Sequence, residues 1–193
     1  MNAARSYHHG DLRKAVIAAA LDVIAESGPG ALSMRDLARR AGVSHAAPAH
    51  HFKDRAGLLT AIAAEGYDLL AASLAESAEI REMGVGYVRF AERHAAHFQV
   101  MFRPDLVHAD DPDLVRARSR AGERLRQGVA GLSEPGRGDD ARLAGVAAWS
   151  LAHGFATLLL SGSLAGPVGD RDPAEAFRAV AALLFGTDSE PPH

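Results

Sequence analysis

Residues 33–55 carry a group of side chains suited to binding a phosphate-rich polymer. Arginine and lysine donate charged hydrogen bonds to phosphate oxygens, and a histidine ring nitrogen can donate or accept a hydrogen bond. The first 55 residues hold eight Lys and Arg against five acidic residues, although the whole chain has a net charge of −3. This segment therefore presents a local positive field to an anionic partner. The basic side chains that could make such contacts are Arg35, Arg39, His45, His50, Lys53 and Arg55.

The residues between these cations have the spacing of two short helices joined by a tight turn. A helix-turn-helix needs a small residue where the helices touch, a glycine that takes positive φ, and an apolar anchor after it. Ala38, Gly42 and Val43 supply these three features in order. Ser33 and Ser44 are candidate N-caps, so we expect helices at about 33–41 and 44–51. The sequence predicts a DNA-binding element in which the second helix enters a groove.

The rest of the chain predicts an all-α fold. No stretch alternates apolar and polar residues for long enough to indicate a strand, and Gly and Pro separate helix-like blocks. We expect an N-terminal three-helix DNA-binding domain over 1–55, a C-terminal helical bundle over 56–187 and a disordered tail over 188–193. The nine or so expected helices span about 11–27, 33–41, 44–51, 55–77, 85–97, 98–102, 112–132, 139–161 and 173–186.

Several short motifs resemble the DNA-binding domain of the TetR family of repressors, over residues 10 to about 62. The resemblance implies an all-α homodimer whose recognition helix enters the major groove of a palindromic double-stranded DNA operator. It also implies a C-terminal domain that binds an unknown small-molecule inducer, which releases the repressor from its operator. The matching segments are Ala18-Ala19-Ala20-Leu21 with Gly28, Leu32-Ser33-Met34-Arg35-Asp36-Leu37-Ala38, Ala41-Gly42-Val43-Ser44, and His51-Phe52-Lys53-Asp54-Arg55 with Leu58-Leu59.

By this resemblance the recognition helix carries the base-contacting residues. Ala46 and Ala47 could offer only apolar contact, for example to a thymine methyl group. Two positions depart from the family pattern: Ala49 stands where an aromatic residue is common, and Pro48 lies within a short helix. The expected DNA-binding residues are Arg35, Arg39, Ser44, His45, Ala46, Ala47, His50, Lys53 and Arg55.

Trp149, followed four residues later by His153-Gly154, resembles a TetR subgroup that is marked by a Trp and a His-Gly pair. Trp149 and His153 share one helix face, where they either line a pocket or pack the core. His94 and His97 have a spacing that could hold a metal, but no carboxylate pattern accompanies them, so we expect neither a metal nor a cofactor. The expected ligand-binding residues are Phe90, His94, Phe98, Trp149 and His153.

Two other functions compete with a ligand-controlled repressor. One is a constitutive dimeric DNA-binding protein without a ligand, which the sequence does not distinguish from a ligand-controlled repressor. The other is an enzyme on a helical bundle, which is disfavoured because the zinc-hydrolase, serine-hydrolase and nucleotide-binding motifs do not occur.

The lack of cysteine and of an apolar leader predicts a cytoplasmic protein with no membrane partner. The apolar faces of the helices at 139–161 and 173–186 predict a four-helix dimer interface.

Overall fold

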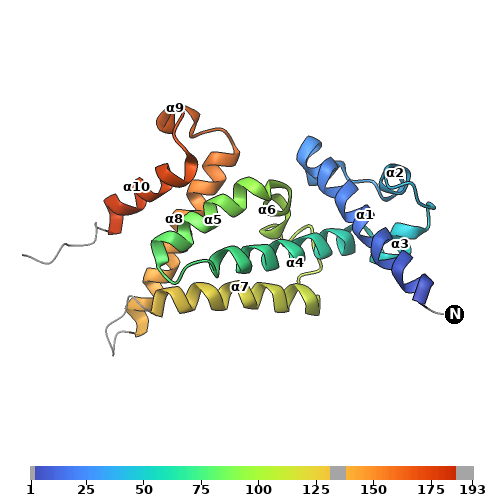
Figure 1. Ribbon diagram of the computed structural model, residues 1–193, viewed down its shortest axis with the longest axis horizontal. Helices are drawn as coiled ribbons and strands as arrows, with labels where there is room; N and C mark the ends of the chain where they lie inside the picture. The colour runs from blue at the N-terminus through green and yellow to red at the C-terminus, as the bar shows by residue number, and fades with distance from the viewer. Residues whose placement is uncertain (1–2, 131–137, 186–193) are drawn as a thin grey trace, which may run out of the picture. The chain divides into compact units, whose positions relative to one another are not determined.

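The computed structural model describes residues 3–130 and 138–185, and within these ranges every regular element is a helix. The prediction of an all-α fold is confirmed. The expected tail at 188–193 lies outside the described residues. The elements, labelled in Figure 1, are α1 (Ala3–Ser27), η1 (Pro29–Ala31), α2 (Met34–Arg40), α3 (Ala47–Phe52), α4 (Arg55–Leu74), α5 (Ile80–Arg93), α6 (Ala95–Met101), α7 (Pro112–Ala130), α8 (Gly138–Leu160), α9 (Ala165–Val168) and α10 (Pro173–Phe185).

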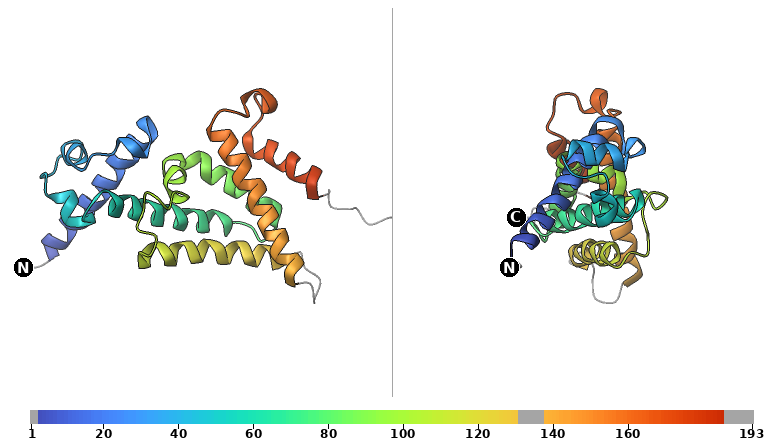
Figure 2. Two further views of the ribbon diagram at one scale, coloured as in Figure 1. Left: turned by 180° about the vertical axis from the view of Figure 1, so that it is seen from behind. Right: turned by 90° about the vertical axis from the view of Figure 1, so that its right-hand side faces the viewer.

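The chain divides into two compact units. The first contains Met1–Tyr67 with His94–Arg118, and the second contains Asp68–Arg93 with Ser119–His193. In the first unit α1 packs on α2, α3 and α6, and Figure 2 shows the N-terminal group from two further sides. Val16, Ala20 and Ile24, which recur every four residues on α1, are fully inaccessible to solvent there. α1 therefore forms the support on which α2 and α3 pack.

The second unit is built on α5, which packs against both α8 and α10. Phe155 of α8 and Phe177 of α10 stack edge to face with ring centroids 5.4 Å apart. Gly84 lets α10 come close to α5, since a Cβ on Gly84 would lie 2.5 Å from the Phe177 ring. At the rim, the Arg178 guanidinium donates to the Glu82 carboxylate at 2.7 Å. These contacts fix α8 and α10 on one scaffold.

Several helices differ from the sequence prediction, and α5 begins at Ile80 rather than near residue 85. The first helix begins at Ala3 rather than near Asp11, because Gly10 does not interrupt it. The expected helix at 85–97 is broken at His94, whose φ of −124° and ψ of 40° are not helical. The break lets α6 turn His97, Phe98, Val100 and Met101 into the interior. A short helix, α9, occupies part of the stretch expected to be a loop at 162–172.

Candidate DNA-binding surface and ligand groove

The turn between α2 and α3 has the hydrogen bonds of a glycine-terminated helix end. Gly42 adopts φ of +66°. Its N–H donates to the Arg39 carbonyl at 3.3 Å, and the Val43 N–H donates to the Ala38 carbonyl at 2.9 Å. This pair of bonds is the Schellman arrangement, which needs a residue in the left-handed region at the position of Gly42. At the other end of α2, the Ser33 hydroxyl accepts the Asp36 N–H, as the sequence predicted.

The helix after the turn begins later than expected. It starts at Ala47, with Ala46 rather than Ser44 at the N-cap and no side-chain cap. The reason is Pro48, which has no N–H to donate to the Ser44 carbonyl, as a helix starting at Ser44 would require. The Ser44 carbonyl instead accepts the Ala47 N–H at 3.0 Å. The expected cap at Ser44 is therefore wrong, and His45 and Ala46 lie in a turn before α3.

One side of α3 is buried and the other faces outward. Pro48 and Phe52, four residues apart, are both buried, and the Arg13 guanidinium lies 5.5 Å from the centre of the Phe52 ring. Ala49 and His50 are exposed on α3, as are Ser44, His45 and Ala46 before it, whereas Ala47 is half-buried. Of the residues proposed for DNA contact in this segment, Ser44, His45, Ala46 and His50 are therefore accessible to a partner.

The four predicted cations differ in how freely they could meet a phosphate. Arg35 and Lys53 are exposed, and so is Arg39, whose side chain is 71% accessible and pairs with Asp36 at 3.4 Å. Arg55 is half-buried, and its Nη2 donates to the Pro29 carbonyl at 2.6 Å. Arg55 therefore holds η1 against the start of α4, and its phosphate contact stays a prediction.

The joint between α3 and α4 is held by short-range contacts. Lys53 has a positive φ of 66°, and the Asp54 N–H donates to the Phe52 carbonyl at 2.8 Å. The Asp54 carboxylate caps α4 by accepting the Gly57 N–H at 2.7 Å. This bond, together with nearby His108, lowers the pKa of Asp54. Gly57 packs so closely on the Phe52 carbonyl that no side chain fits between them.

The predicted ligand-binding residues do not form one cluster within either unit. His94 and Phe98 lie in the first unit, where Phe98 is buried, and Phe90, Trp149 and His153 lie in the second. His153 accepts or donates a hydrogen bond to the Tyr87 hydroxyl at 2.9 Å through Nδ1. Burial lowers the pKa of His153, and its ring lies 5.8 Å from that of Trp149.

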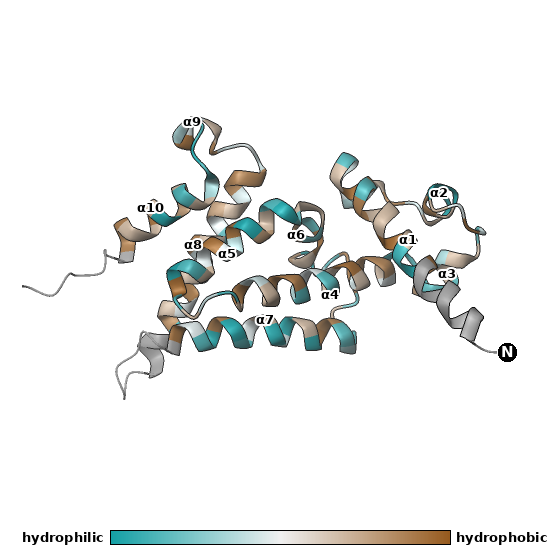
Figure 3. Cartoon of the chain, in the orientation of Figure 1, coloured by the Kyte–Doolittle hydropathy of each residue, from teal (hydrophilic) through white to brown (hydrophobic). Residues whose placement is uncertain are grey.

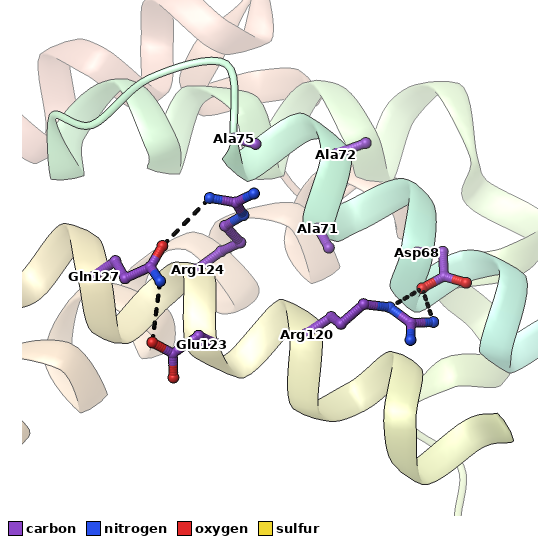
Figure 4. A pocket seen from close by; sticks show the side chains of 8 residues that line it. All are labelled: Asp68, Ala71, Ala72, Ala75, Arg120, Glu123, Arg124 and Gln127. Atoms are coloured by element: carbon purple, nitrogen blue, oxygen red, sulfur yellow. Dashed lines mark hydrogen bonds and ion pairs between the residues drawn. The ribbon is translucent and has the colours of Figure 1, made fainter. Parts of the chain in front are cut away.

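Two hollows of the second unit have polar and apolar walls that the sequence did not indicate. One, between α4 and α7, has a volume of about 400 Å³ and an alanine floor, and its arginines are engaged with Asp68 and Gln127 (Figure 4). The other, the α7–α8 groove, has a volume of about 540 Å³. The available sequence signal was the recurrence of arginine every four residues on the predicted helix at 112–132, at Arg116, Arg120 and Arg124. The α7–α8 groove is lined by Gly122, Leu125, Arg126, Val129, Arg142, Gly145, Val146 and Trp149.

Among the residues whose side chains the structure describes, 12–129 and 142–184, no group of three His, Asp or Glu is placed to hold a metal ion. Two helical segments, Arg55–Leu74 and Arg142–Leu160, are long and apolar enough to cross a membrane by length and composition. Half of the first is buried inside the protein, but only 17% of the second is. Most of this segment of α8 is therefore not buried by the described residues.

Comparison with known proteins identifies the family. Residues 16–62 match the profile described as bacterial regulatory proteins of the tetR family, and residues 80–184 match the tetracyclin repressor-like C-terminal domain. No curated protein sequence matches the chain significantly.

Solved structures agree with both profiles. A protein of unknown function from Rhodococcus sp. RHA1 is 32% identical, with 93% of this chain and 96% of that chain covered and a TM-score of 0.72. The TetR family transcriptional regulator PfmR from Thermus thermophilus is 24% identical over 91% and 99%, with a TM-score of 0.67. LfrR from Mycobacterium smegmatis, solved with proflavine, is 18% identical over 94% and 98%, with a TM-score of 0.60. Since one matching profile alone spans more than half of the sequence and the helix-turn-helix geometry accompanies the other, this chain belongs to the TetR family of bacterial regulatory proteins.

Proposed function

We propose that the protein is a cytoplasmic transcriptional repressor that binds a palindromic operator as a homodimer and leaves it when a small molecule binds. The observation that carries the DNA-binding part is the turn at Gly42, which holds α2 and α3 as a helix-turn-helix beneath an exposed basic surface. In this motif the second helix contacts base edges while the first crosses the backbone. We assign base contact to His45 and His50, and phosphate contact to Arg35, Arg39 and Lys53.

The homodimer is supported by apolar side chains that are exposed among the described residues. On α8, Leu143 is 62% and Leu158 is 47% exposed, and on α10, Leu183 and Leu184 are 85% and 65% exposed. Figure 3 shows the hydrophobic last turn of α10 that carries these leucines. A Cβ on Gly154 would meet nothing within 4 Å, so α8 has room for a helix from outside the chain. A second copy that brings its own α8 and α10 would cover both faces.

DNA binding is tested by a mobility shift on the DNA upstream of the protein's own coding region, at several salt concentrations. Each phosphate contact contributes about 0.9 to the slope of log affinity against log salt, so losing one contact per subunit lowers a dimer's slope by about 2. Lys53→Ala and Arg39→Ala should each produce that change. Arg116→Ala is the matched control, because Arg116 is an exposed arginine on α7, outside the helix-turn-helix. Unchanged slopes for both test variants would refute their phosphate contacts.

The dimer interface is tested by sedimentation of Leu183→Glu. Introducing a charge into an apolar interface should convert the dimer to a monomer and weaken operator binding, because a single recognition helix reads few bases. Val115→Glu is the control, since Val115 is also an exposed apolar residue but lies on α7. A Leu183→Glu protein that sediments as a dimer would show that the subunits meet elsewhere.

A further inference from the structure

The α7–α8 groove combines an apolar wall with a basic rim. Leu125 and Val129 contribute the α7 side, and Val146 and Trp149 contribute the α8 side. Trp149 is 43% exposed and Val146 is 53% exposed, whereas Val129 is buried at the base. Arg126 and Arg142 stand at the edges, and none of the described residues that line the groove carries a carboxylate.

The two arginines are not equivalent. Arg126 already donates to the Glu123 carboxylate at 2.5 Å, so much of its charge is compensated. Arg142 is exposed near the start of α8 and is the other cationic side chain among the described residues that line the groove. A neutral apolar molecule would contact only the apolar wall and make no charge-assisted hydrogen bond to Arg142. An organic anion would contact the wall and also accept a hydrogen bond from Arg142.

The groove is kept open by a glycine. Gly122 lines it, and a Cβ built there would meet only the Arg126 side chain, at 3.5 Å. A larger residue at this helical position would therefore extend into the groove without disturbing the backbone. A volume of about 540 Å³ falls within the range of pockets that hold drug-sized molecules.

We infer that the α7–α8 groove binds a small amphipathic organic anion, with its apolar body against Trp149 and Val146 and its acidic group at Arg142. This inference rests on the proposed ligand-controlled function and names the ligand's chemical class. It also gives Trp149, which the sequence assigned either to a pocket or to the core, a position on the ligand's apolar side.

The experiment uses Trp149 as its reporter, since it is the only tryptophan in the chain. The full-length protein without DNA is titrated with octanoate and, separately, with 1-octanol, which has the same chain length but no charge. Octanoate should change Trp149 emission saturably and bind about 5- to 10-fold more tightly than 1-octanol, as a charge-assisted contact at a partly exposed rim provides. Equal affinities, or no change in emission with octanoate, would overturn the inference.

Three variants locate the binding. Arg142→Gln should weaken octanoate binding about 5- to 10-fold and leave 1-octanol binding unchanged. Gly122→Leu should abolish binding of both, while its higher helix propensity keeps α7 folded, as circular dichroism would verify. Arg116→Gln, on α7 outside the groove, is the charge-matched control. An Arg142→Gln protein with wild-type affinity, or an equal loss in Arg116→Gln, would refute the site.

DNA binding is measured separately, so that the two proposals fail separately. If octanoate binds in the groove but the protein does not bind its upstream DNA, the repressor function is refuted and the groove assignment stands. If the protein binds DNA but octanoate does not affect Trp149, the groove assignment is refuted and DNA binding stands. The same result is expected if a second copy of the chain covers the groove. In that case Trp149 emission would also change with protein concentration, because dilution would separate the two copies.

Discussion

Replacing Gly42 tests the geometry of the helix-turn-helix most directly. A Cβ on Gly42 would meet nothing within 4 Å, so Gly42→Ala introduces no clash, and its only cost comes from φ of +66°. An L-residue in the left-handed region costs about 1–2 kcal/mol. Because alanine also restricts the unfolded chain, which favours folding by about 0.4–1 kcal/mol, the net loss of stability should be near 1 kcal/mol.

Gly30→Ala is the matched control for this prediction. Gly30 is also exposed, and a Cβ there also meets nothing within 4 Å, but its φ is not positive. The effect of alanine on the unfolded chain is the same in both variants, so the difference between their unfolding free energies isolates the turn strain, about 1–2 kcal/mol. Asparagine, which tolerates the left-handed region, should restore much of the loss at position 42.

Urea denaturation followed by circular dichroism, at one protein concentration for all variants, measures these differences. Gly42→Val should be worse than Gly42→Ala, because a β-branched residue is strained further at positive φ. It should also reduce operator affinity, since relaxing the turn re-aims α3. If Gly42→Ala and Gly30→Ala have the same stability within about 0.5 kcal/mol, the turn is not under the constraint described here.

Three further changes probe the first unit. Gly57→Ala should destabilise the protein by about 1–3 kcal/mol in urea denaturation, because its Cβ would collide with the Phe52 carbonyl; wild-type stability would mean that the joint is loose. Burial lowers the pKa of His97 below its usual 6.5 despite the opposing charge of Glu65. The unfolded chain then binds a proton that the folded chain does not, so stability should fall as pH drops below about 6.5, and His97→Gln should flatten that slope. His45→Ala should change the relative affinities across an operator library, and an unchanged ranking would exclude His45 from base recognition.

The helix-turn-helix was largely predictable because its determinants are local. Ser33 caps α2 and Gly42 ends it through backbone bonds that depend on residues within one or two turns. The predicted start of α3 at Ser44 is too early. Serine favours the N-cap, but the missing N–H of Pro48 prevents a helix from starting there. That constraint was visible in the sequence.

Other features depend on contacts between distant residues. No glycine or proline marks the break at His94, which arises because α6 buries His97, Phe98, Val100 and Met101. Arg55 was assigned to phosphate, yet its guanidinium donates to Pro29, which is 26 residues away. The α7–α8 groove likewise exists only because two helices meet at Gly145, where a Cβ would lie 3.3 Å from Val129. Helical periodicity identifies a face but not the element that packs against it.

The joint between α3 and α4 has a mechanical consequence. Gly57 packs directly on the Phe52 carbonyl, and the Asp54 carboxylate binds the Gly57 N–H. These contacts leave no space for the chain to bend at the joint, so we expect α3 and the first turn of α4 to move together. The 20 residues of α4 span roughly 30 Å, and a tilt of about 5° about one end moves the other by about 2–3 Å. That displacement is comparable to a hydrogen-bond length, so a small angular change would be enough to break the base contact proposed for His50. His45 and His50, which we propose to contact bases, are not among the residues that hold this joint. Substituting them should therefore leave the coupling between α3 and α4 unchanged.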